Sequence, residues 1–100
     1  MKIKIWIAGA LLGLVGCGGN PGPLEGTWQL EGGFLNTTVH FRHGESEALG
    51  MIDKVSYKRV GNDVLMTYES GMSEGTTVRY TMTGPDSARW EHGTLRRVRQ

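Results

Sequence analysis

The sequence predicts an all-β fold: a small antiparallel meander of about seven strands, a closed or half-open barrel, after an N-terminal signal peptide. From residue 24 onward, apolar and polar residues alternate in short stretches, which is the period of a half-buried strand. Glycine-containing turns separate these stretches at intervals of roughly 8 to 12 residues. No stretch of this part repeats its apolar residues with the period of a helix.

Seven stretches are expected to form the strands of this meander. They are 24–31, 36–42, 49–60, 64–68, 78–82, 88–91 and 94–98. On the apolar face of the third stretch lie Leu49, Met51, Val55 and Tyr57. Asp53 falls on the same face, which favours a bulge or break near residues 50–53. A buried carboxylate needs a partner, and Arg59 and Arg97 are the candidates.

Residues 1–16 have the composition of a signal peptide. Two lysines lie within the first four residues, eleven mostly apolar residues follow from 5 to 15, and Gly16 ends the segment. As a helix, the apolar run would reach about 16 Å, roughly half the thickness of a bilayer core. A basic start, a short apolar run and a small-residue end are typical of a secretory leader.

The segment Leu14-Val15-Gly16-Cys17 resembles the lipobox of bacterial lipoproteins. The resemblance implies cleavage between Gly16 and Cys17, and attachment of acyl chains such as palmitate to Cys17. Two or more chains give stable membrane anchoring. Because Gly18 and not aspartate follows the cysteine, the resemblance implies the outer membrane, on its periplasmic face.

The chain is therefore expected to divide into three parts. Residues 1–16 form the leader, 17–23 the lipidated cysteine with a glycine- and proline-rich linker, and 24–100 one small barrel domain. Six extended residues reach at most about 20 Å, so the linker would hold the domain close to the membrane. Cys17 is the only cysteine, which leaves the domain without a thiol for disulfide, metal or nucleophilic chemistry.

The charge of the chain gives no reason to expect a nucleic-acid partner. Two of its 11 basic residues lie in the leader and all 10 acidic residues lie after it, so the chain from Cys17 onward has a net charge of about −1. Nucleic-acid-binding domains carry a basic excess. The expected partners are the membrane, through the lipid anchor, and a protein of the cell envelope.

Gly26-Thr27-Trp28, in a first predicted strand, resembles the Gly-x-Trp motif of lipocalin-like (calycin) domains. In that family, an arginine of the last strand packs across this tryptophan. The resemblance assigns the role to Arg97, which shares the parity of Leu95, with Arg96 as the second candidate. A guanidinium over an indole is a favourable cation–π contact. The chain is about half the length of a full lipocalin, so the resemblance implies a miniature barrel.

A row of aromatic side chains is expected to face the barrel interior. It consists of Trp28, Phe41, Tyr57, Tyr68, Tyr80 and Trp90. These residues could line a pocket for a small apolar ligand. Barrels of about eight strands, however, have interiors barely wide enough for their own side chains or one small ligand. The sequence therefore favours a packed aromatic core and keeps the ligand pocket as the alternative.

No motif of the sequence indicates catalysis, a metal site or a cofactor. His40 and His43, with Glu45 and Glu47 nearby, have spacing that would place the two histidines on opposite faces of a strand. Ser73 has Gly-x-Ser-x-Gly spacing within residues 71–75, but it lies in a predicted loop between strands, without the strand–turn–helix setting of a nucleophile elbow. We therefore expect a non-enzymatic lipoprotein that acts through protein contacts, as an accessory, inhibitor, or immunity or exclusion factor. The alternative is a binding module for a small apolar or lipid-like ligand.

Overall fold

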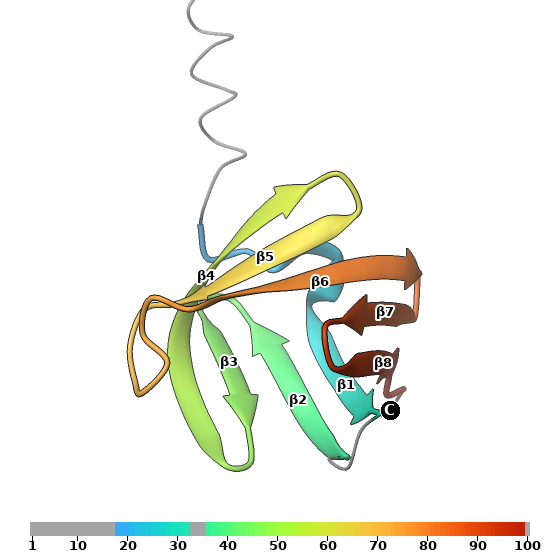
Figure 1. The fold of residues 1–100 in the computed structure, drawn as a ribbon, viewed down its shortest axis with the longest axis horizontal. Coiled ribbons are helices and arrows are strands. Elements are labelled where there is room, and N and C mark those ends of the chain that lie inside the picture. The colour runs from blue at the N-terminus through green and yellow to red at the C-terminus, as the bar shows by residue number, and fades with distance from the viewer. Residues whose placement is uncertain (1–17, 33–35, 100) are drawn as a thin grey trace, which may run out of the picture.

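The computed structural model describes residues 18–32 and 36–99. The predicted leader and Cys17 lie outside these residues. The described chain contains one short 3-10 helix, η1, and eight strands (Figure 1). Their bounds are η1 Gly22–Leu24, β1 Gly26–Glu31, β2 Thr37–Arg42, β3 Glu45–Ala48, β4 Met51–Val60, β5 Asp63–Tyr68, β6 Thr77–Gly84, β7 Ser87–Trp90 and β8 Gly93–Arg97.

The eight strands form a closed antiparallel barrel. Each strand pairs with the next along the chain, and β8 returns to pair with β1. Trp28 lies opposite Val39 on one side and opposite Arg97 on the other. Closure removes the unpaired edges of an open sheet. The predicted all-β antiparallel meander is confirmed, and the barrel is closed.

The eighth strand is β3, which lies between the predicted stretches 36–42 and 49–60. Its residues alternate, but its inward side chains are Ser46 and Ala48, which are too small and polar to be recognised as an apolar face. The small size fits the neighbouring strands, because Ser46 lies opposite Phe41 of β2. Without an apolar alternation, the short strand has no signal of its own in the sequence.

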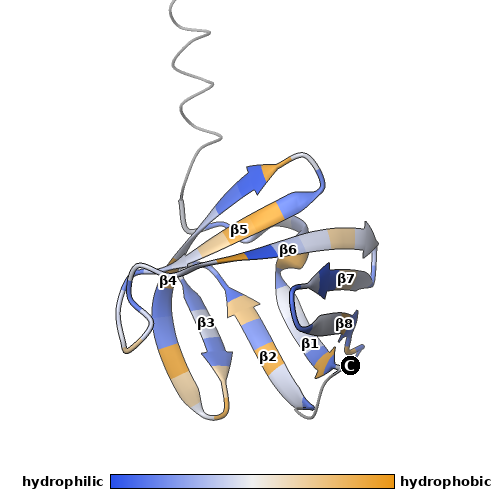
Figure 2. Ribbon diagram, in the orientation of Figure 1, coloured by the Kyte–Doolittle hydropathy of each residue, from blue (hydrophilic) through white to orange (hydrophobic). Residues whose placement is uncertain are grey.

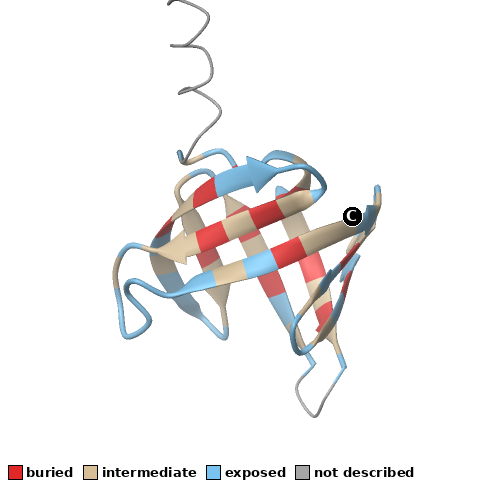
Figure 3. Cartoon of the chain, turned by 45° about the horizontal axis from the view of Figure 1, so that its top comes forward, coloured by how far each residue is buried: buried red, intermediate tan, exposed pale blue. Residues whose placement is uncertain are grey.

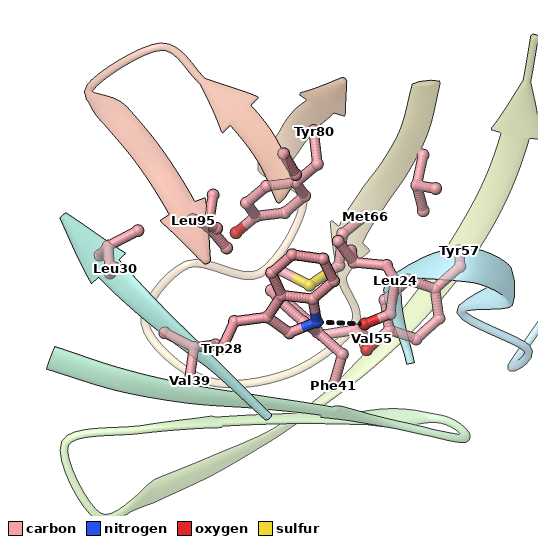
Figure 4. Close-up of a cluster of buried hydrophobic side chains, with 12 residues drawn as sticks. Leu24, Trp28, Leu30, Val39, Phe41, Val55, Tyr57, Met66, Tyr80 and Leu95 are labelled. Carbon is pink, nitrogen blue, oxygen red and sulfur yellow. Dashed lines mark hydrogen bonds between the residues drawn. The ribbon is translucent and has the colours of Figure 1, made fainter. Parts of the chain in front are cut away.

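The barrel interior is filled by side chains from all around the sheet. Buried and less buried residues alternate along the strands (Figure 3). The buried hydrophobic residues are Leu24, Trp28, Leu30, Val39, Phe41, Val55, Tyr57, Val64, Met66, Tyr80, Ala88 and Leu95. Figure 4 shows Trp28 at the centre of this cluster, with Phe41 below it and Leu24 beside it. The interior is thus a packed core, as expected for a barrel of this size.

Residues 18–25, which the sequence predicts to be largely linker, are docked against one end of the barrel. The backbone of Gly18 exchanges two hydrogen bonds with that of Tyr57, at 2.9 and 2.6 Å. The carbonyl of Gly19 accepts a bond from the amide of Gly44 at 2.8 Å, and Pro21 is buried. Leu24 of η1 is fully buried and closes this end of the core. The backbone is irregular as predicted, but it does not extend away from the domain.

The barrel therefore has two different ends. We call the one covered by η1 the η1 end; it also carries the turns 43–44, 61–62 and 85–86. At the other, the open end, lie the connections 49–50, 69–76 and 91–92. The described chain begins at the top of Figure 1, whereas the turn between β3 and β4 lies at the bottom. Within residues 18–32 and 36–99, no helix is long and apolar enough to cross a membrane.

Candidate functional site

Trp28 and Arg97 meet at the η1 end of the barrel. The central guanidinium carbon of Arg97 lies 4.4 Å from the centre of the Trp28 ring. The indole nitrogen of Trp28 donates a 2.8 Å hydrogen bond to the carbonyl of Leu24 (Figure 4). The contact joins two segments that are far apart in sequence, because Trp28 belongs to β1 and Arg97 to β8.

Arg97 also ties η1 and the β6–β7 turn to the barrel. It donates hydrogen bonds to the carbonyls of Glu25 at 2.7 Å and Pro23 at 2.9 Å, and to the carboxylate of Asp86 at 3.0 Å. Gly26 makes room for it, since a β-carbon there would lie 2.8 Å from the guanidinium. Arg96 points outward instead and pairs with Glu31 at 3.5 Å. This cluster is a closure of the barrel, and every polar group in it has a partner.

The aromatic residues of the predicted row do not form one cavity wall. Trp28, Phe41 and Tyr57 are almost fully buried in the core. The Tyr57 hydroxyl donates a 2.6 Å hydrogen bond to the carbonyl of Glu45, and burial raises the pKa of the Tyr57 phenol. Tyr80 lies between the core and the open end: the centre of its ring is 5.2 Å from that of Phe41 and 6.1 Å from that of Trp90. Four of the row, including Tyr80, therefore belong to the packed core, and Tyr68 and Trp90 pack against it.

The open end retains one apolar pocket of about 160 Å³. The predicted aromatic residues that reach it are Phe41, Tyr68, Tyr80 and Trp90, and aliphatic side chains of Leu30 and Leu49 complete much of the wall. A cavity of about 150 Å³ holds a molecule the size of benzene. The pocket is therefore large enough for one aromatic or branched apolar group, and too small for a larger ligand.

Few polar atoms enter this pocket. Burial and, second, the nearby charge of Asp53 raise the pKa of the Tyr68 phenol. The side chain of the buried Ser46 reduces this rise by hydrogen bonding. The indole N–H of Trp90 is buried, and no acceptor for it is found in the described part of the chain. An unpaired buried donor costs free energy that an acceptor on a bound group would recover.

Exposed apolar side chains lie at the open end, and one of them, Leu49, also lines the pocket. Leu49, Met51 and Ile52 are each more than half exposed at the β3–β4 turn, and Met72 is exposed in the β5–β6 loop. The two segments are adjacent, because the amide of Lys54 bonds to the Ser70 hydroxyl at 3.1 Å. The start of β4 is orange at the bottom of Figure 2. We call Leu49, Met51, Ile52 and Met72 the apolar rim.

The sequence predicts that Leu49 lies on the inward face of a strand that continues to residue 60, and this was wrong. Met51 does share the parity of Val55 in β4, but it is exposed at the start of the strand. Ala48 pairs with Met51, so residues 49 and 50 form a two-residue hairpin turn. Both have positive φ, 54° at Leu49 and 77° at Gly50, as in a type I′ turn. Leucine is strained in this conformation, which asparagine and glycine tolerate. The rim was missed because Leu49-Gly50 lacks the usual asparagine of such a turn.

The candidate metal and acid–base residues do not converge. A histidine nitrogen of His40 lies 3.0 Å from the Thr27 hydroxyl, whereas Glu45 and Glu47 both pair with Arg42. Among the described residues, no group of three or more histidine, cysteine or carboxylate side chains is arranged to hold a metal ion.

Asp53 is half-buried at the open end and packs beside Gly71. Neither of the partners expected for it is there: Arg97 pairs with Asp86, and Arg59 bonds to the carbonyl of Gly61. The reason is position, since Asp53 lies near the open end and both arginines lie toward the η1 end. Water at the open end can solvate its charge.

The chain was also compared with known proteins. No family model, curated protein or solved structure gives a significant match to it.

Proposed function

We propose that this protein is a small lipoprotein, anchored through Cys17 in the outer membrane, that acts without catalysis through contacts with another envelope protein. The observation that carries the proposal is the combination of a filled barrel and an exposed apolar rim. The core leaves a pocket of only about 160 Å³, while binding sites for small molecules usually need roughly 300 Å³ or more. Exposed contiguous apolar side chains mark interaction surfaces.

The lipocalin-like assignment is part of this proposal. It is supported by the closed eight-stranded barrel and by the contact of Trp28 with Arg97. Fold resemblance does not by itself define an activity, so the binding of a small ligand does not follow from it. No enzymatic role is proposed, because the described carboxylates and histidines are paired or separate.

The docking of residues 18–25 supports a particular form of anchoring. If Cys17 carries the acyl chains, the next residue, Gly18, is already bonded to Tyr57. The barrel is then held against the membrane with almost no slack. Any partner must meet the protein at this membrane or be presented to it there.

Binding of a small apolar ligand is the second candidate function. The apolar lining of the pocket, including Tyr80 and Trp90, favours it, but the volume limits the ligand to about the size of one aromatic ring. A full lipid acyl chain would need the core to rearrange.

Two experiments test the proposal. Cell fractionation should find the full-length protein in the membrane and Cys17→Ala in the soluble fraction, with the β-sheet circular dichroism spectrum retained. A membrane-bound Cys17→Ala variant would refute the anchor. Affinity capture from intact envelopes should return the same protein partner in repeated experiments, and the lack of any reproducible partner would refute action through protein contacts.

A further inference from the structure

We propose that the open end is a docking site for a protein segment that inserts one large apolar side chain, flanked by basic residues, into the pocket within the apolar rim. This inference rests on the proposed function and specifies the chemistry of the partner. It is carried by four independent features of the open end: a strained exposed leucine, the size of the pocket, the charge of the loops, and the position relative to Gly18.

Leu49 is the first feature. It is 69% exposed and has a φ of 54°, so it lacks the burial that would compensate for its backbone strain. Asparagine or glycine at this position would make a more stable turn. A leucine that reduces stability while exposing apolar surface is best explained by a contact that it makes with a partner.

The pocket limits what can be inserted. It lies beside Leu49, and its volume of about 160 Å³ matches one phenylalanine- or leucine-sized side chain. Its walls are mainly aromatic and aliphatic, with Met66, Val78 and Trp90 among them. A large side chain that fills an apolar pocket of this kind is the usual centre of a protein interface.

The loops of the open end add a negative charge. The connections 49–50, 69–76 and 91–92 contain Glu69, Glu74 and Glu91 and no lysine or arginine. Asp53 and Lys54 lie beside them at the start of β4, so these segments together carry four acidic side chains and one lysine. Complementary charge increases association rate and specificity, so basic residues are expected on both sides of the inserted side chain.

The position of the rim argues against lipid as its occupant. Gly18 is bonded to Tyr57 at the η1 side of the molecule, and the rim lies at the opposite end of the barrel (Figure 1). An anchor at Cys17 would therefore hold the rim away from the membrane in which its acyl chains insert. The acidic loops also disfavour contact with anionic lipid headgroups.

The test uses the full-length protein in nanodiscs of zwitterionic lipid, with labelled methyl groups observed by NMR. The probe is the peptide acetyl-Lys-Lys-Phe-Lys-Lys-amide, and its controls replace Phe by Ala or all four Lys by Glu. We expect saturable shifts at Leu49, Ile52 and Met66 with the Phe–Lys peptide. Both control peptides should bind about tenfold more weakly.

Two variants assign the binding to the rim. Leu49→Asn should weaken the binding of the Phe–Lys peptide about tenfold. It should also raise the melting temperature of the protein by roughly 4 °C or more, since the turn is relieved of strain. Val60→Asn is the matched control, because Val60 is an exposed apolar residue at the η1 side. It should bind the peptide as the unmodified protein does.

Several results would overturn the inference. These are no saturable shift, equal binding of the three peptides, shifts confined to the η1 end, or unchanged binding by Leu49→Asn. Broadening of the Leu49 and Ile52 methyl signals by spin-labelled lipid chains would show that lipid, and not protein, covers the rim. An unacylated Cys17 would instead refute the anchor, while the peptide titration could still be interpreted. Failure of the proposed anchor and failure of the docking inference are therefore distinguishable.

Discussion

At the residue scale, Arg97 shows how one side chain can close a small barrel. Its guanidinium stacks on Trp28 and bonds to backbone carbonyls of the segment that covers the η1 end. The planar donor groups of arginine suit such a set of acceptors, and a lysine could not reach all of them. This is why the parity of Arg97 with Leu95 matters more than its charge: the neighbouring Arg96 has the same charge and faces solvent.

We predict that Arg97→Ala lowers the free energy of unfolding by about 2 kcal/mol, because it removes the cation–π contact and leaves the carbonyls of Pro23 and Glu25 without this donor. Arg97→Lys should recover less than half of this loss. Urea unfolding followed by tryptophan fluorescence measures both. Arg96→Ala, on the same strand, is the control and should change stability by no more than about 0.5 kcal/mol. Equal effects of Arg96→Ala and Arg97→Ala would contradict the assignment.

The strain at Leu49 gives a second prediction at this scale. Leu49→Asn should raise the free energy of unfolding by about 1 kcal/mol, since asparagine adopts positive φ more readily than leucine. Ile52→Asn, at an exposed strand position two residues beyond the turn, should not stabilise the protein. Chemical denaturation of the two variants side by side tests this, and a destabilised Leu49→Asn would show that the leucine is needed for folding.

At the scale of elements, the segment 18–25 belongs to the folded domain. Gly18 adds a bridge to the backbone of β4, and Leu24 of η1 closes the core. Glycine and proline in the sequence predict irregular backbone, which is present. They cannot predict docking, because docking depends on partners in β4 and in the β2–β3 turn that are distant in sequence.

Leu24→Ala is therefore expected to lower the free energy of unfolding by about 2–4 kcal/mol, the usual cost of a cavity in a core. Leu49→Ala removes the same atoms from an exposed site and serves as the matched control. Denaturation midpoints report the difference between them. A Leu24→Ala variant as stable as the unmodified protein would mean that η1 is not part of the cooperative fold.

The β6–β7 turn should make stability depend on acid pH. Hydrogen bonding to Arg99, with the charges of Arg99 and Arg97, holds the pKa of Asp86 below its ordinary value of 3.8. A carboxyl whose pKa is lowered in the folded state stabilises the protein above its unfolded pKa, and this contribution is lost as the pH falls through the folded value. The stability of the protein should therefore decline below about pH 4.

Asp86→Asn tests this link. Its stability should fall less steeply below pH 4 than that of the unmodified protein, and Arg99→Gln should flatten the same limb by removing the partner. Thermal unfolding between pH 2 and pH 7 supplies the measurement. An acid limb that Asp86→Asn leaves unchanged would assign the dependence to other carboxyls, such as Asp63, whose pKa is lowered first by a hydrogen bond from Thr81 and then by Arg79.

The sequence was sufficient for most strands and insufficient where side chains are small or the turn is unusual. Alternation of large apolar residues identified seven strands, and the eighth, β3, has only Ser46 and Ala48 on its inward face. The resemblance to lipocalin-like domains paired Trp28 with an arginine of the last strand, and parity with Leu95 selected Arg97 over Arg96. Parity also placed Leu49 inward, since nothing in the local pattern shows that a leucine occupies a turn with positive φ.

At the scale of the whole molecule, the two ends of the barrel have different properties. The η1 end is closed by Leu24, Trp28 and Arg97, and the chain enters the barrel there at Gly18. The open end keeps a pocket of about 160 Å³ inside an exposed apolar rim. With an anchor at Cys17, next to the η1 end, the apolar rim at the opposite end would face away from the membrane surface.

The central proposal, a lipid-anchored barrel that works through protein contacts, is tested most directly by native mass spectrometry of the protein extracted from membranes. The proposal predicts a mass equal to residues 17–100 plus acyl chains, with no releasable small molecule. A mass that begins at Met1 would contradict the anchor. A stoichiometric small ligand released on unfolding would contradict the filled barrel and make the ligand-binding function the better one.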